Sequence, residues 1–126
     1  MDKARETALK ALHEVNEKGA YGSGPLGRIL RSANLSDMDR SFVTELVYGA
    51  VKAGGTLDWM LRRYVNRPLS KIPPMVRDIL RLGIYQLFFM ARVPASAACN
   101  TAVEMTKRCS HAGTVKFVNG VLRTAA

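Results

Sequence analysis

The side chains best suited to binding chemistry are basic and amide groups in the C-terminal part of the chain. Lys116, Asn119 and Arg123 follow one another at helical spacing, so a helix places them on one face. Lys107 and Arg108 lie in the preceding helical segment. Lysine and arginine neutralise phosphates, and an amide both donates and accepts hydrogen bonds. The spacing therefore predicts a basic strip that suits an anionic polymer.

Asn119 is followed by a glycine, which costs helix stability, about 1 kcal/mol against alanine. In a structural interpretation, Asn100 and Asn119 form hydrogen bonds with nearby helix ends or loops, and Gly120 lets a neighbouring helix cross closely. In a functional interpretation, the two amides belong to the basic strip and meet RNA. Periodicity favours the structural interpretation, and the two are compatible, because a satisfied amide can fix the edge of a binding face.

Other residues offer weaker candidates. Arg77 and Arg81 lie one helical turn apart, so we expect both to reach phosphates. Tyr21, Trp59 and Tyr64 could stack on bases, but aromatic residues pack more often in or beside a core. The sequence therefore does not single out these three as binding residues.

The cysteines and histidines do not form a reactive or metal-binding pattern. Cys99 and Cys109 are the only cysteines, and neither His13 nor His111 stands at ligand spacing from them. We expect both cysteines to be small buried apolar residues. No catalytic residue and no metal ligand is predicted.

Length and charge limit the possible classes of protein. A chain of 126 residues with 48% hydrophobic residues is long enough for one domain with a core. No segment resembles a membrane span or a signal peptide, so we expect a cytoplasmic protein. The net charge is +9, and residues 58–126 hold nearly all of it. Such localised basic charge suits the binding of nucleic acid. The alternative is a basic surface that serves only solubility.

Helical periodicity runs through the whole chain, and no strand pattern competes with it. We expect Ser36 to cap a helix that Gly54 and Gly55 stop, and a further helix from Thr56 to Pro68. Pro73 and Pro74 open the most apolar segment, which predicts a central helix. The fold class is therefore all-α, with short connections.

The end of this central helix also allows a different class of function. Phe88, Phe89 and Met90 follow one another where the helix is apolar nearly all round. An exposed apolar patch of this kind would dock another domain or subunit. A protein-docking module therefore remains an alternative to an RNA-binding one.

Five segments in order resemble the NusB/RsmB-like RNA-binding domain: KARETALKALHEV, DRSFVTELVYGAVK, VRDILRLGIYQLFFM, VPASAACNTAVEMTKR and FVNGVLR. The resemblance covers nearly all of residues 1–126. It implies an all-α, compact bundle of about seven helices in two packed subdomains. It also suggests that Lys3 and Arg5 contact RNA, as the first helix does in NusB, although the arginine-rich N-terminus typical of NusB is thin here.

Two functions share this domain. One is the N-terminal ribosomal RNA-binding part of RsmB-type (cytosine-5) methyltransferases, whose cofactor S-adenosylmethionine we expect in a missing catalytic domain. The other is the free-standing antitermination factor, which binds leader RNA together with a ribosomal protein. ELVYGAVK, TLDWML and VPASAA resemble the methyltransferase more. We therefore expect an RNA-binding domain without catalysis of its own, forming a monomer or weak dimer, with RNA and either a catalytic domain or a ribosomal protein as partners.

Overall fold

The protein is a bundle of α-helices. The computed structural model describes residues 2–18 and 23–126, and over these residues it contains helices and turns but no strand. This confirms the expected all-α bundle of about seven helices. The elements are α1 (Lys3–Lys18), α2 (Ser23–Ala33), α3 (Asp37–Lys52), α4 (Gly54–Leu61), the short 3-10 helix η1 (Leu69–Lys71), α5 (Pro74–Phe89), α6 (Ala95–Cys109) and α7 (Ala112–Ala125).

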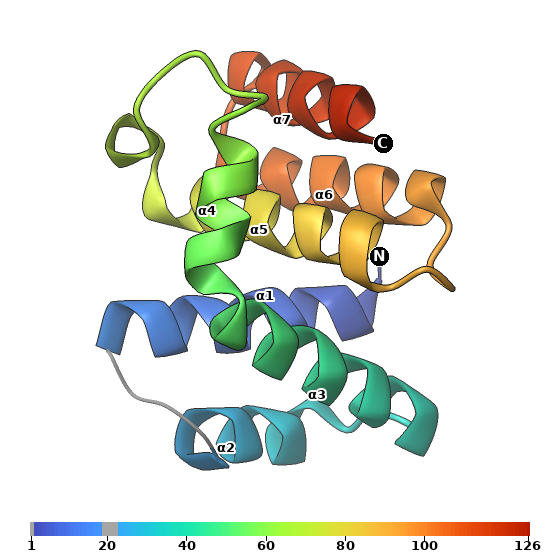
Figure 1. Ribbon diagram of the computed structural model, residues 1–126. Coiled ribbons are helices and arrows are strands. Elements are labelled where there is room, and N and C mark those ends of the chain that lie inside the picture. Colours follow the sequence, from blue (N-terminus) through green and yellow to red (C-terminus); the bar gives the residue numbers. More distant parts are fainter. Residues whose placement is uncertain (1, 19–22) are drawn as a thin grey trace.

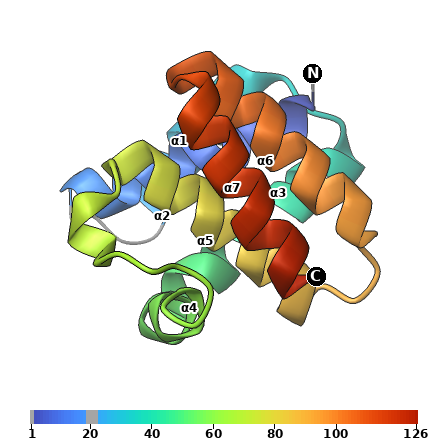
Figure 2. The same ribbon diagram turned by 90° about the horizontal axis from the view of Figure 1, so that it is seen from above.

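The helices form two packed groups. In Figure 1, α1, α2 and α3 make the lower group, and α4 to α7 make the upper one. The most extensive contacts join α1 to α3 in the first group and α6 to α7 in the second. Viewed from above, α7 runs over α6 and α5 and covers the top of the molecule (Figure 2). No helix among the described residues is long and apolar enough to cross a membrane.

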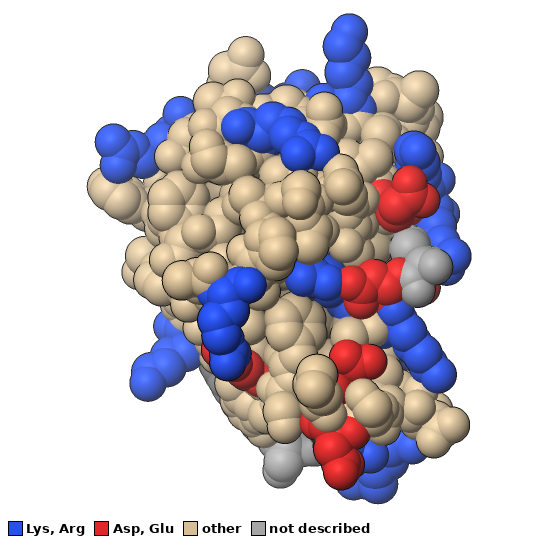
Figure 3. All heavy atoms as spheres, turned by 90° about the vertical axis from the view of Figure 1, so that its right-hand side faces the viewer, with Lys and Arg blue, Asp and Glu red and all other residues tan. Residues whose placement is uncertain are grey.

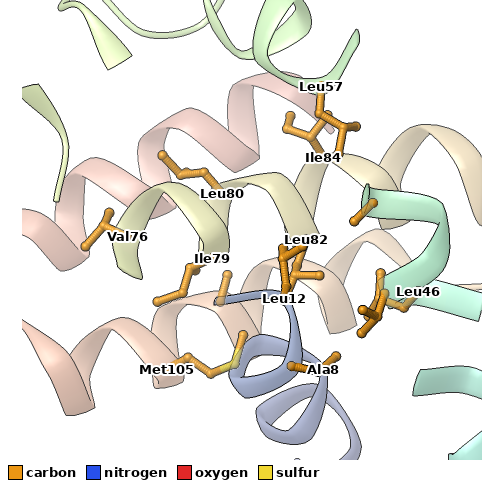
Figure 4. Close-up of a cluster of buried hydrophobic side chains, with 14 of the residues drawn as sticks. Ala8, Leu12, Leu46, Leu57, Val76, Ile79, Leu80, Leu82, Ile84 and Met105 are labelled. Atoms are coloured by element: carbon orange, nitrogen blue, oxygen red, sulfur yellow. The ribbon is translucent and has the colours of Figure 1, made fainter. Parts of the chain in front are cut away.

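Helix α5 is the centre of the fold, as its apolar sequence predicts. It contacts α1, α3, α4, α6 and α7. The close-up in Figure 4 shows Leu12 of α1, Leu46 of α3 and Leu82 of α5 in one hydrophobic cluster. All three side chains are almost completely buried. Both helix groups therefore share one hydrophobic core.

Helix starts follow the local sequence closely. Ser36 caps α3, and its hydroxyl accepts a hydrogen bond from the Asp39 backbone N–H at 3.1 Å. Pro74 is the first residue of α5, where its missing N–H is no loss. Both helix starts are as expected from the sequence. Helix α1 extends to Lys18.

The segment after α3 differs from the expectation. Gly54 and Gly55 do not form a stop but the first turn of α4, because α3 already ends at Lys52 and Ala53 caps both helices. The helix expected to run to Pro68 ends at Leu61. An irregular linker and η1 follow instead of a continued α-helix, and Leu69 and Ile72 anchor this segment in the core.

Candidate nucleic-acid interface

Several of the expected RNA-binding residues meet in a groove between α6 and α7. The groove has a volume of about 680 Å³. Helix α6 contributes Lys107, and α7 contributes Lys116 and Asn119. Both lysines are exposed. The α6–α7 groove is defined by Asn100, Val103, Glu104, Lys107, Ser110, Ala112, Val115, Lys116 and Asn119.

Arg123 joins the two sides of this groove. Its Nη2 donates to Asn100 Oδ1 of α6 at 2.6 Å, and its Nε donates to Asn119 Oδ1 of α7 at 3.2 Å. The two amide oxygens orient the guanidinium, while the side chain remains exposed. The functional interpretation placed Asn100 in the basic strip, and the structure brings its amide to the groove beside Arg123. Asn100 lies two helical turns before Lys107, and this spacing places both on the same face of α6.

The two interpretations of Asn119 and Gly120 now separate. Asn119 is half-buried, and its hydrogen bond to Arg123 holds the groove edge rather than a helix end. Gly120 is exposed, and a Cβ built on it meets nothing within 4 Å. The interpretation that Gly120 lets a neighbouring helix cross closely is therefore wrong.

Other basic candidates lie elsewhere on the molecule. Arg108 points to α1, where its Nη1 lies 3.0 Å from Glu6 Oε1. Lys3 is exposed at the start of α1 and lines a separate pocket between α1 and α2. Neither of these residues lines the α6–α7 groove, and their contact with RNA stays a prediction.

Arg5 makes structural contacts along α1 and α5. Its Nε donates a hydrogen bond to Oε1 of the buried Gln86 side chain at 2.6 Å, and a second guanidinium nitrogen forms an ion pair with Asp2. Its guanidinium also lies 4.9 Å from the ring centre of Phe42 on α3. Only 13% of the Arg5 side chain is exposed. Arg5 therefore has a packing role in addition to the predicted one in RNA binding, which remains untested.

Arg81 is the centre of an ion-pair network. Its Nε and Nη2 donate to the two Asp58 oxygens at 2.8 and 3.0 Å, and its Nη1 donates to Asp78 Oδ1 at 2.9 Å. The bonds to Asp58 are the main reason why the pKa of Arg81 is raised. With two carboxylates bound, this guanidinium holds α4 against α5. The two helices pack on one another (Figure 1).

Arg77 lies beside this network. It lines a polar pocket of about 320 Å³ together with Asp58, Asp78 and Arg81. Its Nε is buried, with no hydrogen-bond partner among the described residues. The two arginines that were expected to contact phosphates therefore lie beside the carboxylates of Asp58 and Asp78. Contact of Arg77 and Arg81 with RNA stays a prediction.

The cysteines are only partly as expected. Cys99 is completely buried, whereas Cys109 is exposed, so the prediction of two buried cysteines is wrong for Cys109. Desolvation by surrounding side chains is the main cause that raises the pKa of both thiols, even though the Cys109 residue as a whole is exposed. A raised pKa disfavours the nucleophilic thiolate. Among the described residues, no group of three His, Cys, Asp or Glu side chains could hold a metal ion.

The aromatic candidates fall into different environments. Trp59 is 59% exposed, whereas Tyr64 is half-buried against the core. Tyr21 lies outside the described residues. At the end of α5, Phe88 and Phe89 are exposed as the docking interpretation requires, but Met90 is buried, contrary to the expected patch of three.

Charge is distributed unevenly over the surface. On the face shown in Figure 3, basic side chains are scattered from top to bottom, whereas acidic side chains lie mainly in its middle and lower parts and are absent from its top. In the sequence, residues 58–126 contain only three acidic residues, Asp58, Asp78 and Glu104. Asp58 and Asp78 both form ion pairs with Arg81. The upper helix group therefore presents the stronger positive field.

Comparisons with known proteins identify relatives along the whole chain. The family model described as the NusB family matches residues 2–126. A probable ribosomal RNA small subunit methyltransferase B of Synechocystis is 43% identical over 98% of the chain, and the one of Bacillus subtilis is 41% identical over 95%. The chain spans only 28% and 27% of their lengths. A transcription antitermination protein NusB of Halorhodospira halophila is 32% identical, over 95% of this chain and 77% of that protein.

Solved structures share the fold. A crystal structure of the antitermination factors NusB and NusE in complex with double-stranded RNA matches with a TM-score of 0.86 at 24% identity, over 97% of this chain and 92% of that one. A NusB structure of T. maritima matches with a TM-score of 0.82 at 23% identity, over 98% and 89%. At these identities the likeness concerns the fold alone.

Proposed function

The chain belongs to the NusB family, and from this we propose that it is the RNA-binding domain of a small-subunit ribosomal RNA (cytosine-5) methyltransferase. The relatives named as methyltransferases are more similar to it, at 41–43% identity, than the NusB relative at 32%. They are also three to four times its length. In this proposal the protein acts on ribosomal RNA in the cytoplasm.

The observation that carries RNA binding is the α6–α7 groove. Two helices bring Lys107 and Lys116 to its walls, and Arg123 stands at its end between two amides. Lysines neutralise phosphates as point charges, and an oriented guanidinium can bind a phosphate with two nitrogens. The groove thus provides positive charges that attract the RNA backbone and an oriented guanidinium that can position one of its phosphates.

Catalysis belongs elsewhere in this proposal. A cysteine that attacks cytosine must be an accessible thiolate. Cys99 is buried and therefore does not fit that role, and desolvation raises the pKa of the exposed Cys109 thiol, which disfavours its thiolate. S-adenosylmethionine, which supplies the methyl group, would be bound by a catalytic domain outside these residues.

Charge reversal in the groove tests the proposal. We expect the double variant Lys107→Glu/Lys116→Glu to bind a labelled single-stranded ribosomal RNA about tenfold or more weakly, since two lysines that attract phosphates become carboxylates that repel them. The measurement is fluorescence anisotropy over a series of salt concentrations. The slope of log K against log salt should become shallower by about 0.7 for each phosphate that is no longer neutralised.

Arg31→Glu is the matched control. Arg31 is exposed on α2, in the helix group away from α7 (Figure 1). It changes the net charge in the same direction without touching the groove. If Arg31→Glu weakened binding as much per charge as the groove variant, RNA binding would depend on net charge, and the groove would not be the site.

A free-standing antitermination factor is the second candidate. It is supported by the NusB relatives, of which this chain covers 77% or more. The size of the native protein in a lysate of its source cell separates the two candidates. A species three to four times heavier than 13.9 kDa supports the methyltransferase. A species of this mass supports the antitermination factor and directs the search to a ribosomal-protein partner.

A further inference from the structure

The part of the chain between Asp58 and Asp78 has an unusual charge pattern. It contains five basic residues and no acidic one. Four of the five lie in the linker that follows α4 and in η1, and all four are exposed. No ion pair among the described residues involves any of these four: Arg62, Arg63, Arg67 and Lys71.

An exposed tryptophan belongs to the same surface. Trp59 of α4 is 59% exposed, although a large aromatic side chain gains most from burial. The Arg63 guanidinium lies 5.2 Å from the centre of its ring. This cation contact orients the indole and leaves much of the ring open to solvent. We call this surface the α4 corner and define it by Trp59, Arg62, Arg63, Arg67 and Lys71.

The α4 corner adjoins the α6–α7 groove through helix α7. The Arg67 guanidinium lies 4.3 Å from the centre of the Phe117 ring. Phe117 directly follows Lys116, which lines the groove. Figure 1 shows the linker after α4 rising to the height of α7. Two consecutive residues of α7 therefore face the two surfaces, which lie on adjoining sides of this helix.

We propose that the α4 corner is a second contact surface for single-stranded RNA, with Trp59 as a stacking platform for an unpaired base. The cations around it, which form no ion pair with other described residues, would neutralise the neighbouring phosphates. Aromatic rings amid basic residues bind single strands in this way, because every base has a face to stack and every nucleotide a charge. The inference rests on the proposed RNA-binding function and extends its site beyond the groove.

Intrinsic fluorescence gives a direct test. Trp59 is the only tryptophan of the chain, so all indole emission reports this corner. We expect a single-stranded RNA of about 16 nucleotides to quench the emission as a base stacks on the ring. A fully paired RNA of the same sequence should quench much less, because its bases are not free to stack.

Substitutions complete the test by anisotropy with the same RNA. Trp59→Ala should weaken binding about tenfold, and Trp59→Phe should restore most of the affinity. Arg62→Glu/Arg67→Glu should weaken binding and reduce the salt slope. The matched controls are Met38→Ala, which removes a side chain that is 82% exposed on α3, and Arg31→Glu on α2. Thermal melting verifies that each variant is folded.

The outcomes separate the two proposals. Quenching together with weaker binding by Trp59→Ala supports the α4 corner. If the protein binds RNA through the groove, but without quenching and with unchanged affinity in the corner variants, the corner proposal is wrong and a protein partner becomes its better occupant. If the unmodified protein binds no RNA at all, the proposed function fails as well.

Discussion

A single carboxylate, Asp78, holds three polar side chains from α1 and α5 together. It accepts hydrogen bonds from Asn16 at 2.7 Å and Arg81 at 2.9 Å, and it lies 2.9 Å from a ring nitrogen of His13. Asp78 is only 1% exposed. A buried carboxylate is tolerated only when it is paired and hydrogen-bonded, and Asp78 satisfies both conditions.

Removing Asp78 should therefore destabilise the protein strongly. We expect Asp78→Ala to lower the free energy of unfolding by about 3–5 kcal/mol, because it leaves polar partners unpaired in the interior. The measurement is urea denaturation. Glu104→Ala, which removes the exposed partner of Lys107, should change the stability by no more than about 0.5 kcal/mol. Equal losses in the two variants would contradict a special role for Asp78.

The same network shows where sequence reasoning stops for single residues. Helical spacing correctly places Arg77 and Arg81 one turn apart on α5. The carboxylate that binds Arg81 with two bonds, Asp58, comes from another helix. Spacing within one helix cannot reveal a partner from a different one. Only Asp78, three residues before Arg81, was a local warning that the charge is neutralised.

At the scale of helices, two glycines have opposite roles. A Cβ on Gly83 of α5 would lie 2.7 Å from Cδ1 of Leu122 on α7. Leu122 is completely buried, so it has no free space to move into. Gly83 therefore sets the distance between α5 and α7. Gly120 of α7 has open space where its Cβ would be, so packing does not require a glycine there.

Alanine substitution should reveal this contrast. We expect Gly83→Ala to lower the free energy of unfolding by about 1–3 kcal/mol through overpacking, despite the better helix propensity of alanine. Gly120→Ala should raise it by about 0.5–1 kcal/mol, since only the propensity changes. Chemical denaturation of both variants measures the difference. A stabilised Gly83→Ala protein would mean that α7 shifts easily.

Helix boundaries could be predicted from the sequence where a local signal exists. Ser36 and Pro74 begin α3 and α5 by their own chemistry, so these starts were predictable. Gly54 and Gly55 were ambiguous, because glycine permits a helix end as well as a tight passage from one helix to the next. The packing of α4 on α5 favours the tight passage from α3 into α4, and such packing is not visible in the local sequence.

For the whole molecule, periodicity and charge were the informative signals. The all-α class and the central position of α5 followed from apolar spacing, which directly reflects burial. The basic excess of residues 58–126 pointed to the half of the chain that holds the groove. It did not reveal that the candidates divide into a groove on α6 and α7, an ion-pair network on α5 and separate positions on α1. That division depends on how the helices pack.

Helix α7 carries both proposed surfaces, and this links RNA binding to its own dynamics. Its Lys116 lines the groove, its Phe117 supports the α4 corner, and its Leu122 anchors it on Gly83. RNA bound to both surfaces must be released before α7 can open. RNA at 100 times its Kd should therefore slow hydrogen exchange of the α7 amides up to about a hundredfold where opening disrupts both surfaces. Mass spectrometry of exchange measures this, with α2 as the internal reference that should not change. Equal protection of α2 and α7 would show that bound RNA stabilises the whole fold and does not specifically prevent the local opening of α7.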